Sequence, residues 1–282
     1  MPNAWEEITS RHNALLVETH KLSDRKHRTR TGLFRFDGVK LAVEAIARDV
    51  EIVAILLRAS DAERVAERIF TMSKKRFPEG ARVACVADAV FDGLTEESAP
   101  EGILCVARMG SPHGGQELSV QARERVVLLE SVRDPSNLGA IIRSAAAFGV
   151  HRLVLSSDCA DIYNAKTVRA SMGTLFSQRI DRVDDLTEAV ALLKRQGRRV
   201  FAAALDASAQ RLGSFDPLLS DCVVIGNEGH GLSTRMIKAC GESIYIPMTE
   251  HAESLNAAVA ASVLMWDFYR LAVGEKSGGE RA

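Results

Sequence analysis

The chain alternates between short apolar runs and longer stretches in which apolar residues recur at helical spacing. Apolar runs of about four to six residues predict strands, at residues 33–36, 52–57, 82–86, 103–107, 126–129, 152–155, 200–205, 222–226 and 244–246. Helical spacing predicts helices at residues 5–30, 39–48, 61–75, 138–148, 163–172, 184–196 and 254–271. Because strands separated by helices pair in parallel and place helices on both faces of a sheet, the expected fold class is α/β.

A run of glycine, proline and polar residues interrupts this alternation at residues 110–116. Such a composition is typical of a linker or a surface loop. We therefore expect an α/β domain over residues 1–108, a linker over 109–123, a second α/β domain over 124–273 and a flexible tail over 274–282. The length of 282 residues also fits two domains of ordinary size.

The composition argues against several classes of protein. The chain has 36 Lys and Arg against 37 Asp and Glu, a net charge of −1, which argues against a wholly basic nucleic-acid binder. No apolar run reaches the roughly 18 residues needed to span a membrane, and the first residues show no signal-peptide pattern. The five cysteines form no Cys-x-x-Cys pair, so neither a zinc site nor a disulfide framework is predicted. We expect a cytoplasmic protein without a bound metal.

Positive charge is concentrated in one place although the total is balanced. The basic side chains of this cluster are Lys21, Arg25, Lys26, Arg28 and Arg30. A cluster of this kind is either a solvated helix end or a surface that binds phosphate groups. The cluster by itself leaves both interpretations open.

Three segments of the second half place small polar residues and glycine where a strand gives way to a loop. In open parallel sheets this is where ligands bind. In the first segment Pro135 ends the strand, Ser136 or Asn137 can cap the following helix, and Gly139 leaves space beside Arg143 on the same helical face. A plain capped helix with a surface arginine also accounts for this segment.

The second segment, residues 226–232, contains three glycines that allow the backbone to approach a ligand closely. Glu228 in this segment can align a cation or a hydroxyl group, or can simply cap the next helix. The spacing matches neither the dinucleotide-binding fingerprint nor a phosphate-binding loop. A plain tight turn is the alternative interpretation.

The third segment runs from Ile246 to the start of the last predicted helix. Ser254 is the expected N-cap of that helix. Asn256 lies off the apolar stripe of the helix, and its amide can both donate and accept hydrogen bonds. A capped core helix without any chemistry is the alternative interpretation of this segment.

Together the segments resemble the three ordered motifs of the SpoU, or TrmH-like, RNA 2′-O-ribose methyltransferases of the SPOUT class. The first motif resembles Asn137-x-Gly139-x-x-x-Arg143. The second resembles Ile225-Gly226-Asn227-Glu228-Gly229-x-Gly231, and the third resembles Ile246-Pro247-Met248 followed by Ser254-Leu255-Asn256. The stretch from Ala160 to Gly173 is also similar to a stretch of that family. Residues 13–38 with Glu44 resemble its amino-terminal substrate-binding domain, which is related to kink-turn-binding ribosomal proteins.

The resemblance implies that a methyl group is transferred from S-adenosylmethionine to a ribose 2′-hydroxyl, by a domain with a carboxyl-terminal trefoil knot. It assigns cofactor binding to Gly226, Ile246, Met248 and Leu255. It assigns the catalytic site to Asn137, Arg143, Glu228, Ser254 and Asn256. In the family the arginine is proposed to help remove the hydroxyl proton. Anchoring the target phosphate is easier for a guanidinium, whose pKa exceeds about 12.

The resemblance also implies partners for this chain. An RNA substrate makes the basic cluster a phosphate-contacting surface, with Lys166 and Arg169 as a second candidate pair. The family implies a homodimer, without metal or membrane. We expect 23S-type ribosomal RNA as the substrate, because the amino-terminal domain resembles ribosomal RNA binders. A tRNA 2′-O-methyltransferase and a non-catalytic RNA-binding or ribosome-assembly protein are the alternatives.

Overall fold

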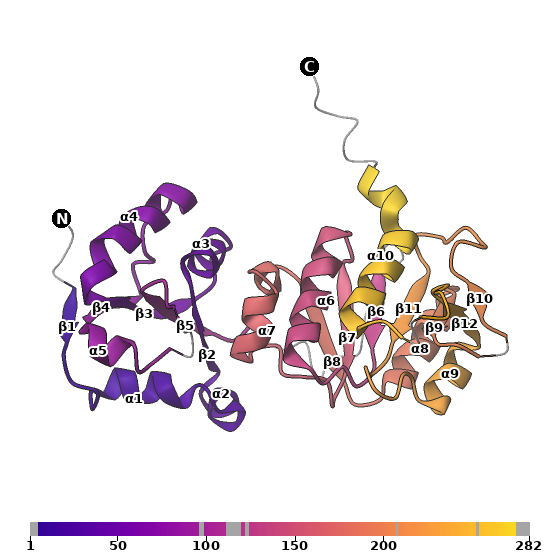
Figure 1. The fold of residues 1–282 in the computed structure, drawn as a ribbon, viewed down its shortest axis with the longest axis horizontal. Helices are drawn as coiled ribbons and strands as arrows, with labels where there is room; N and C mark the ends of the chain where they lie inside the picture. Colours follow the sequence, from indigo (N-terminus) through magenta and orange to yellow (C-terminus); the bar gives the residue numbers. More distant parts are fainter. Residues whose placement is uncertain are drawn as a thin grey trace, which may run out of the picture. The chain divides into compact units, whose positions relative to one another are not determined.

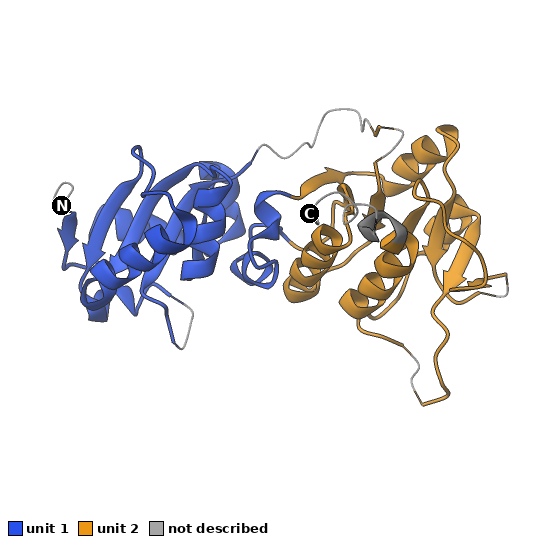
Figure 2. Cartoon of the chain, turned by 90° about the horizontal axis from the view of Figure 1, so that it is seen from above, with its two compact units in different colours: residues 1–110, 161–177 blue, residues 111–160, 178–282 orange. Residues whose placement is uncertain are grey.

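The computed structural model describes residues 5–95, 99–110, 120–121, 124–206, 208–251 and 254–274. The chain divides into two compact units, shown in blue and orange in Figure 2. Unit 1 consists of residues 1–110 and 161–177, and unit 2 of residues 111–160 and 178–282. Most of the predicted linker and nearly all of the predicted tail lie outside the described residues.

Unit 1 is built on a mixed sheet. Within the described residues this sheet has five strands, in the order β1 (Glu6–Ile8), β4 (Arg82–Val86), β3 (Ile52–Arg58), β5 (Ile103–Arg108) and β2 (Leu33–Asp37). Strands β1, β4 and β3 run parallel, whereas β5 is antiparallel to both β3 and β2.

Helices cover both faces of the unit 1 sheet, as Figure 1 shows. Below the sheet lie α1 (Ala14–Lys21) and α5 (Asp88–Phe91), whose Leu16 and Phe91 share a buried cluster with Leu56, Ala84 and Leu104 of the strands. Above it lie α3 (Val39–Ala47) and α4 (Ala62–Ser73), which pack on each other. A short 3-10 turn, η1 (Ala59–Asp61), leads into α4, and α2 (Arg25–Thr31) leads into β2.

Residues 161–177 pack with unit 1 although they lie far along the chain from the rest of it. Their helix α7 (Ala165–Ala170) contacts β2, and their 3-10 turn η2 (Thr174–Phe176) contacts α3. The aromatic ring of Tyr163 lies 4.7 Å from that of Phe34, centroid to centroid. The strand and helix pattern gave no sign of this arrangement, because it depends on contacts more than a hundred residues apart.

Unit 2 is built on a parallel sheet. Within the described residues it has seven strands, in the order β10 (Gln210–Arg211), β12 (Glu242–Tyr245), β9 (Val200–Ala203), β11 (Cys222–Ile225), β6 (Val126–Leu129), β7 (Arg152–Ser156) and β8 (Arg179–Val183). Every pair of neighbouring strands in this sheet is parallel. The predicted α/β class with a parallel sheet is confirmed.

Two layers of helices enclose this sheet, because alternate strand residues point to opposite faces. On one face, Val200 and Ala202 belong to a buried cluster with residues of α8 (Leu186–Arg195) and α9 (Thr234–Cys240). On the other face, Phe201 meets Phe268 of α10 (Ala257–Gly274), with ring centroids 5.7 Å apart. Helix α6 (Pro135–Ala147) packs against α10 in the same layer (Figure 1).

The chain crosses β12 after leaving β9. Ala203 at the end of β9 pairs with Ile244, and Gln210 of β10 pairs with the same residue from the other side. The chain between Ala203 and Gln210 therefore passes from one side of β12 to the other. The trefoil knot implied by the family resemblance stays a prediction.

Each strand expected from the apolar runs is present. The prediction of a helix throughout residues 5–30 is wrong at its start, because β1 occupies Glu6–Ile8 before α1 and α2 begin. The apolar pattern did not predict the elements α5, α9, β8 and β10, because they are short or only weakly apolar. Among the described residues, no helix is both long and apolar enough to cross a membrane.

Candidate active site

The three segments singled out in the sequence follow strands of the unit 2 sheet. The first follows β6, the second β11 and the third β12. Strands β12, β9, β11 and β6 are consecutive neighbours and run parallel, so their carboxyl ends share one edge of the sheet. The fold therefore brings the segments together at the edge where parallel sheets bind ligands.

The N-cap of helix α6 lies two or three residues earlier in the chain than the sequence suggested. Asp134 is the N-cap, and its side chain accepts a hydrogen bond of 2.8 Å from the backbone N–H of Asn137. Pro135 occupies the first turn, where its missing N–H costs nothing. The prediction that Ser136 or Asn137 caps this helix is therefore wrong. Because Asn137 does not cap α6, its side-chain amide is available to other partners.

Gly226 lies beneath a tight turn of the second segment. The backbones of Asn227 and Gly231 exchange two hydrogen bonds, of 3.1 and 3.0 Å, which close the loop back on itself. A Cβ atom on Gly226 would lie 2.6 Å from the carbonyl oxygen of Gly231 and 2.6 Å from the backbone nitrogen of Leu232. Only glycine fits at this position without displacing the backbone. Gly231 itself has a φ of +65°, in the left-handed region that favours glycine.

The third segment ends at the N-terminus of α10. The side-chain oxygen of Asn256 accepts hydrogen bonds from the backbone N–H groups of Ala258 (2.9 Å) and Val259 (3.3 Å). Asn256 is therefore the residue that caps this helix. The expectation that Ser254 is the N-cap is wrong, because α10 starts three residues after Ser254.

Hydrogen-bond direction fixes the orientation of two amides in this site. Because the oxygen of Asn256 faces the end of α10, its amide nitrogen faces away and donates to the side-chain oxygen of Asn137 at 2.9 Å. The amide nitrogen of Asn137 in turn donates to Oε1 of Glu228 at 2.8 Å. A single directed chain, which we call the amide chain, thus runs from Asn256 through Asn137 to Glu228.

The other oxygen of Glu228 is also held. The side-chain nitrogen of Asn227 donates to Oε2 of Glu228 at 3.3 Å and to the backbone oxygen of Ser131 at 2.8 Å. The side-chain oxygen of Asn227 accepts from the backbone N–H groups of Gly229 and His230. Asn227 therefore ties the loop after β11 to the loop after β6. The sequence assigned this residue no role, and its contact with Ser131, 96 residues away, is not visible in local spacing.

Of the predicted catalytic residues, Asn137, Glu228 and Asn256 are joined directly. Arg143 is exposed on α6 and forms no hydrogen bond or ion pair with any residue that the structure describes. Ser254 is exposed too, and no side-chain hydrogen bond joins it to the described part of the chain. Both side chains are therefore available to a ligand, whereas the amide chain is already assembled.

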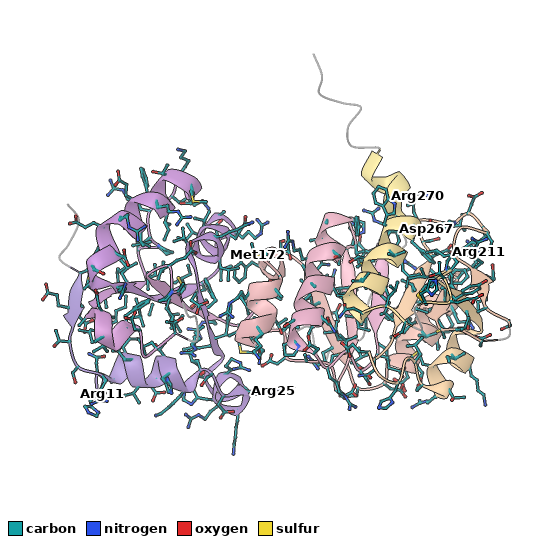
Figure 3. The ribbon with its side chains drawn as sticks, viewed as in Figure 1. Arg11, Arg25, Met172, Arg211, Asp267 and Arg270 are labelled. Carbon is teal, nitrogen blue, oxygen red and sulfur yellow. The ribbon has the colours of Figure 1, made fainter. Side chains whose placement is uncertain are left out.

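Unit 1 places the predicted RNA-binding residues in different environments. Arg25 and Lys26 are exposed on α2, and Figure 3 labels Arg25 on the outside of the unit. Arg30 is exposed with a contact of 2.9 Å to His27, and Lys21 is exposed beside Glu18. These four residues remain candidates for contacts to phosphate.

Arg28 does not belong to this exposed surface. Its side chain is 4% exposed and forms an ion pair of 2.6 Å with Asp161. It also donates to the backbone oxygens of Leu22 and Ser23, both at 2.8 Å. The prediction that Arg28 contacts RNA is therefore corrected: its charge is already paired, and it attaches residues 161–177 to the rest of unit 1.

The second candidate pair lies in the same segment of unit 1. Lys166 is exposed on α7. Arg169 is partly exposed and forms an ion pair of 3.3 Å with Asp37 at the end of β2. Lys166 is therefore the more accessible member of the pair.

These features define the class of α/β proteins in which three loops at the carboxyl edge of a parallel sheet form the site. A family model described as the SpoU rRNA Methylase family matches residues 124–266, and one described as the MRM3-like substrate binding domain matches residues 13–105. The 23S rRNA (guanosine(2553)-2′-O)-methyltransferase RlmP of Bacillus subtilis is 30% identical over 263 residues, covering 93% of this chain and 98% of that protein. The chain belongs to the SpoU rRNA methylase family.

Solved structures agree with this assignment. The AdoMet-bound rRNA methyltransferase from Sinorhizobium meliloti has a TM-score of 0.79 to this chain at 28% identity, covering 94% of this chain and 98% of that one. The SpoU methyltransferase AviRb from Streptomyces viridochromogenes, in complex with the cofactor AdoMet, has a TM-score of 0.77 at 28% identity, covering 93% and 99%. Both proteins bind S-adenosylmethionine.

The residues at the carboxyl edge of this sheet fit S-adenosylmethionine. Met248 is 44% exposed and Leu205 is 82% exposed, and they follow the neighbouring strands β12 and β9. Ile246 and Leu255, in the segment after β12, are half-buried, and Gly226 is a buried glycine directly after β11. Apolar side chains with backbone polar groups are the usual lining of sites for ligands of this kind. The predicted strand at residues 200–205 ends earlier, at Ala203, and leaves Leu205 exposed, because an apolar residue that closes an apolar run looks the same in the sequence as a buried strand end.

Among the described residues, no group of three or more His, Cys, Asp or Glu side chains has the arrangement of a metal site. The described cysteines are free thiols. Burial raises the pKa of the Cys222 thiol to about 11 and that of Cys240 to about 12, so both are protonated at neutral pH. Their environment is that of core residues rather than nucleophiles.

Proposed function

We propose that this protein is an S-adenosylmethionine-dependent methyltransferase that methylates a ribose 2′-hydroxyl in 23S-type ribosomal RNA. The observation that carries the proposal is the amide chain from Asn256 through Asn137 to Glu228. Arg143, further along the same helix α6, is exposed. A carboxylate held on both oxygens at the edge where parallel sheets bind ligands favours an enzyme over a protein that only binds RNA. The relative RlmP, whose name gives the same reaction on 23S rRNA, supports the choice of substrate.

S-adenosylmethionine, when bound, supplies a methyl group already activated on a sulfonium. Transfer of this methyl group to the ribose oxygen would leave a neutral thioether, and the hydroxyl proton would pass to an acceptor, for which the Glu228 carboxylate is the candidate. The chain must therefore orient the hydroxyl and stabilise the oxygen as its proton departs. Gly226, Ile246, Met248 and Leu255 would hold the cofactor through backbone and apolar contacts.

Arg143 orients the target in this proposal. Its planar guanidinium offers five N–H donors, which suit a phosphate and a ribose oxygen together. An arginine is a poor base because its pKa lies above about 12. Glu228, with each carboxylate oxygen held by an asparagine, is the fixed acceptor of the site, and Ser254 offers a further hydroxyl.

RNA recognition falls to unit 1 in this proposal. The exposed cations Lys21, Arg25, Lys26, Arg30 and Lys166, together with the partly exposed Arg169, form a phosphate-contacting surface, which we call the basic surface. Binding through phosphates weakens steeply as salt rises. Because the basic surface is confined to one part of a chain with a net charge of −1, it favours a particular RNA over RNA in general.

We further propose a homodimer that works in the cytoplasm, where ribosomal RNA is made and modified. Helix α10 exposes Val259 (48%) and Trp266 (51%), which lie about two turns apart on this helix. Large apolar side chains on one exposed helix are typical of an interface between subunits. Sedimentation velocity would test this: a species of twice the chain mass is expected, and a monomer at micromolar concentration would refute it.

The reaction itself is tested with purified protein and labelled cofactor. The protein is incubated with S-adenosylmethionine labelled in the methyl group and with unmodified 23S rRNA transcript. We expect label on one ribose 2′-oxygen, found after hydrolysis as a single 2′-O-methyl nucleoside. Cofactor binding without transfer to ribosomal or transfer RNA would overturn the enzymatic proposal. Transfer to tRNA alone would overturn the choice of substrate.

A further inference from the structure

Ser131 has a backbone conformation that is unfavourable for a residue with a side chain. It follows β6 and precedes the start of α6, and its φ is +55°. This left-handed region is occupied readily by glycine and rarely by serine. Such a residue persists only where its surroundings hold it, and strained residues of this kind gather at functional sites.

Three partners hold Ser131. Its backbone N–H donates to Oγ of Ser156 at 2.9 Å, and its hydroxyl donates to Asp158 at 2.7 Å. Its backbone oxygen accepts from the side chain of Asn227 at 2.8 Å, the same side chain that contacts Glu228. Ser131 therefore stands between the loop after β7 and the loop that carries the carboxylate of the site.

Asp158 is the centre of the contacts on the β7 side. Its carboxylate accepts hydrogen bonds of 2.7 Å from the hydroxyls of Ser131 and Ser156 and from the guanidinium of Arg133. Two of these donors, Ser131 and Arg133, belong to the loop that leads from β6 into α6. Asp158 thus accepts hydrogen bonds from two of the six residues that precede Asn137.

The loop that carries Asp158 is itself fixed. The guanidinium of Arg182, on β8, donates to the backbone oxygens of Ser157 (2.8 Å), Cys159 (3.0 Å) and Ala160 (2.7 Å). The backbone N–H of Ala160 donates to the oxygen of Val132 at 2.9 Å. Hydrogen bonds to its backbone therefore fix the loop that carries Asp158.

We infer that Asp158 is a positioning residue, which holds Ser131 in its left-handed conformation so that Asn137 meets Glu228. This inference rests on the proposed function for its catalytic consequence. Asp158 lies outside the three motifs and touches none of Asn137, Arg143, Glu228 or Asn256 among the contacts described. Its effect on the site passes through the backbone of residues 131–137.

The test combines Asp158→Ala with Ser131→Gly. Without Asp158, Ser131 relaxes towards ordinary backbone angles and Asn137 shifts, so kcat should fall on the order of ten-fold, while the KM for RNA and the Kd for S-adenosylmethionine change less than about two-fold. Glycine adopts the left-handed conformation without strain, so the double variant should recover most of the lost kcat. Ser131→Gly alone should stay close to the wild type.

Asp185→Ala is the matched control. Asp185 is a second unit 2 aspartate that receives hydrogen bonds from a hydroxyl, a backbone N–H and an arginine, at the start of α8. Its loss should lower thermal stability as much as the loss of Asp158, without lowering kcat. Equal loss of kcat in both variants, or a double variant no better than Asp158→Ala, would overturn the inference.

Hydrogen exchange separates this inference from the proposed function. In the cofactor-free protein, Asp158→Ala should speed exchange at the backbone amides of residues 131–138, and Ser131→Gly in the same chain should restore protection. Unchanged exchange in Asp158→Ala would overturn the inference even if the enzyme is active. A wild-type protein that shows the expected exchange but methylates no RNA would overturn only the proposed function.

Discussion

The side-chain nitrogen of Asn256 donates a hydrogen bond of 2.9 Å to the side-chain oxygen of Asn137, across 119 residues of sequence. This bond joins the cap of α10 to the first turn of α6. Because the oxygen of Asn256 is committed to the helix end, the direction of the bond cannot reverse. The end of one helix therefore decides which group Asn137 presents to Glu228.

Asn256→Asp should separate capping from catalysis. The carboxylate can still accept from Ala258 and Val259, so the melting temperature should change little. It cannot donate to Asn137, whose amide is then free to turn away from Glu228. We expect kcat to fall by about 100-fold, the order of effect expected for misplaced active-site groups. Asn256→Ala should lose both the cap and the activity, and an Asn256→Asp enzyme with wild-type kcat would contradict the role of the amide chain.

Gly226→Ala should disrupt the turn of the second motif. The new methyl group would meet the backbone of Gly231 and Leu232, and overpacking of this kind costs roughly 1–3 kcal/mol. We expect calorimetry to show lost binding of S-adenosylmethionine together with a lower melting temperature. Gly229→Ala is the control, because its Cβ would come no closer than 3.5 Å to any other group, Oδ1 of Asn227 being the nearest. Equal cofactor affinity in the two variants would count against the assignment of Gly226.

Arg143→Ala should abolish methyl transfer while leaving cofactor binding intact. The side chain has no structural partner among the described residues, so its removal should not lower stability. Arg143→Lys keeps the charge but not the planar set of donors, and we expect it to remain well below wild-type activity. Full turnover of Arg143→Ala with an RNA substrate would remove the arginine from the mechanism.

Neutralising Arg25, Lys26 and Arg30 together should raise the KM for RNA more than it lowers kcat. The rise should shrink as salt increases, because the wild-type enzyme also loses its phosphate contacts at high salt. Arg28→Ala should behave differently: it leaves Asp161 without its partner, and breaking a buried ion pair costs about 3–5 kcal/mol. Filter binding and thermal melts distinguish the two effects. An unchanged KM in the triple variant would show that Arg25, Lys26 and Arg30 do not contribute to RNA binding.

Asp158 should contribute stability that depends on pH. Burial by itself raises the pKa of this carboxyl. Hydrogen bonds from Arg133, Ser131 and Ser156 outweigh the effect of burial and lower the pKa from an ordinary value of 3.8 to about 2. A carboxyl whose pKa is lowered by folding stabilises the protein above its unfolded pKa, and this contribution is lost as the pH falls from about 4 to about 2. The unfolding free energy of Asp158→Asn should therefore fall less steeply than that of the wild type across this window. Parallel curves would show that the carboxylate is not held as described.

The sequence predicted most of the fold because apolar runs mark buried strands directly. It located the site because the segments that carry Asn137, Glu228 and Asn256 follow strands of a parallel sheet and together resemble the three ordered SpoU motifs. It could not assign the caps: Asp134, Ser136 and Asn137 are all good capping residues, and only the backbone decides among them. The sequence did not point to Ser131 or Asp158 either, because a positive φ at a serine leaves no mark on composition or spacing.

Burial of a charged residue was also beyond the sequence. Arg28 belongs to a run of cations, and nothing in that run distinguishes it from Arg25 or Arg30. Its partner Asp161 is 133 positions away and lies inside the region that matches the methylase model. Pairings between distant segments are set by tertiary contacts, which local patterns do not encode.

Methylation of ribosomal RNA by this protein can be measured by mapping ribose methylation on the ribosomal RNA of cells with and without this gene. We predict that one nucleotide of 23S-type RNA loses its 2′-O-methyl group when the gene is deleted. Wild-type protein should restore the modification, whereas Arg143→Ala, made at the same level, should not. Identical ribose methylation of ribosomal RNA in the presence and absence of the gene would show that ribosomal RNA is not the substrate.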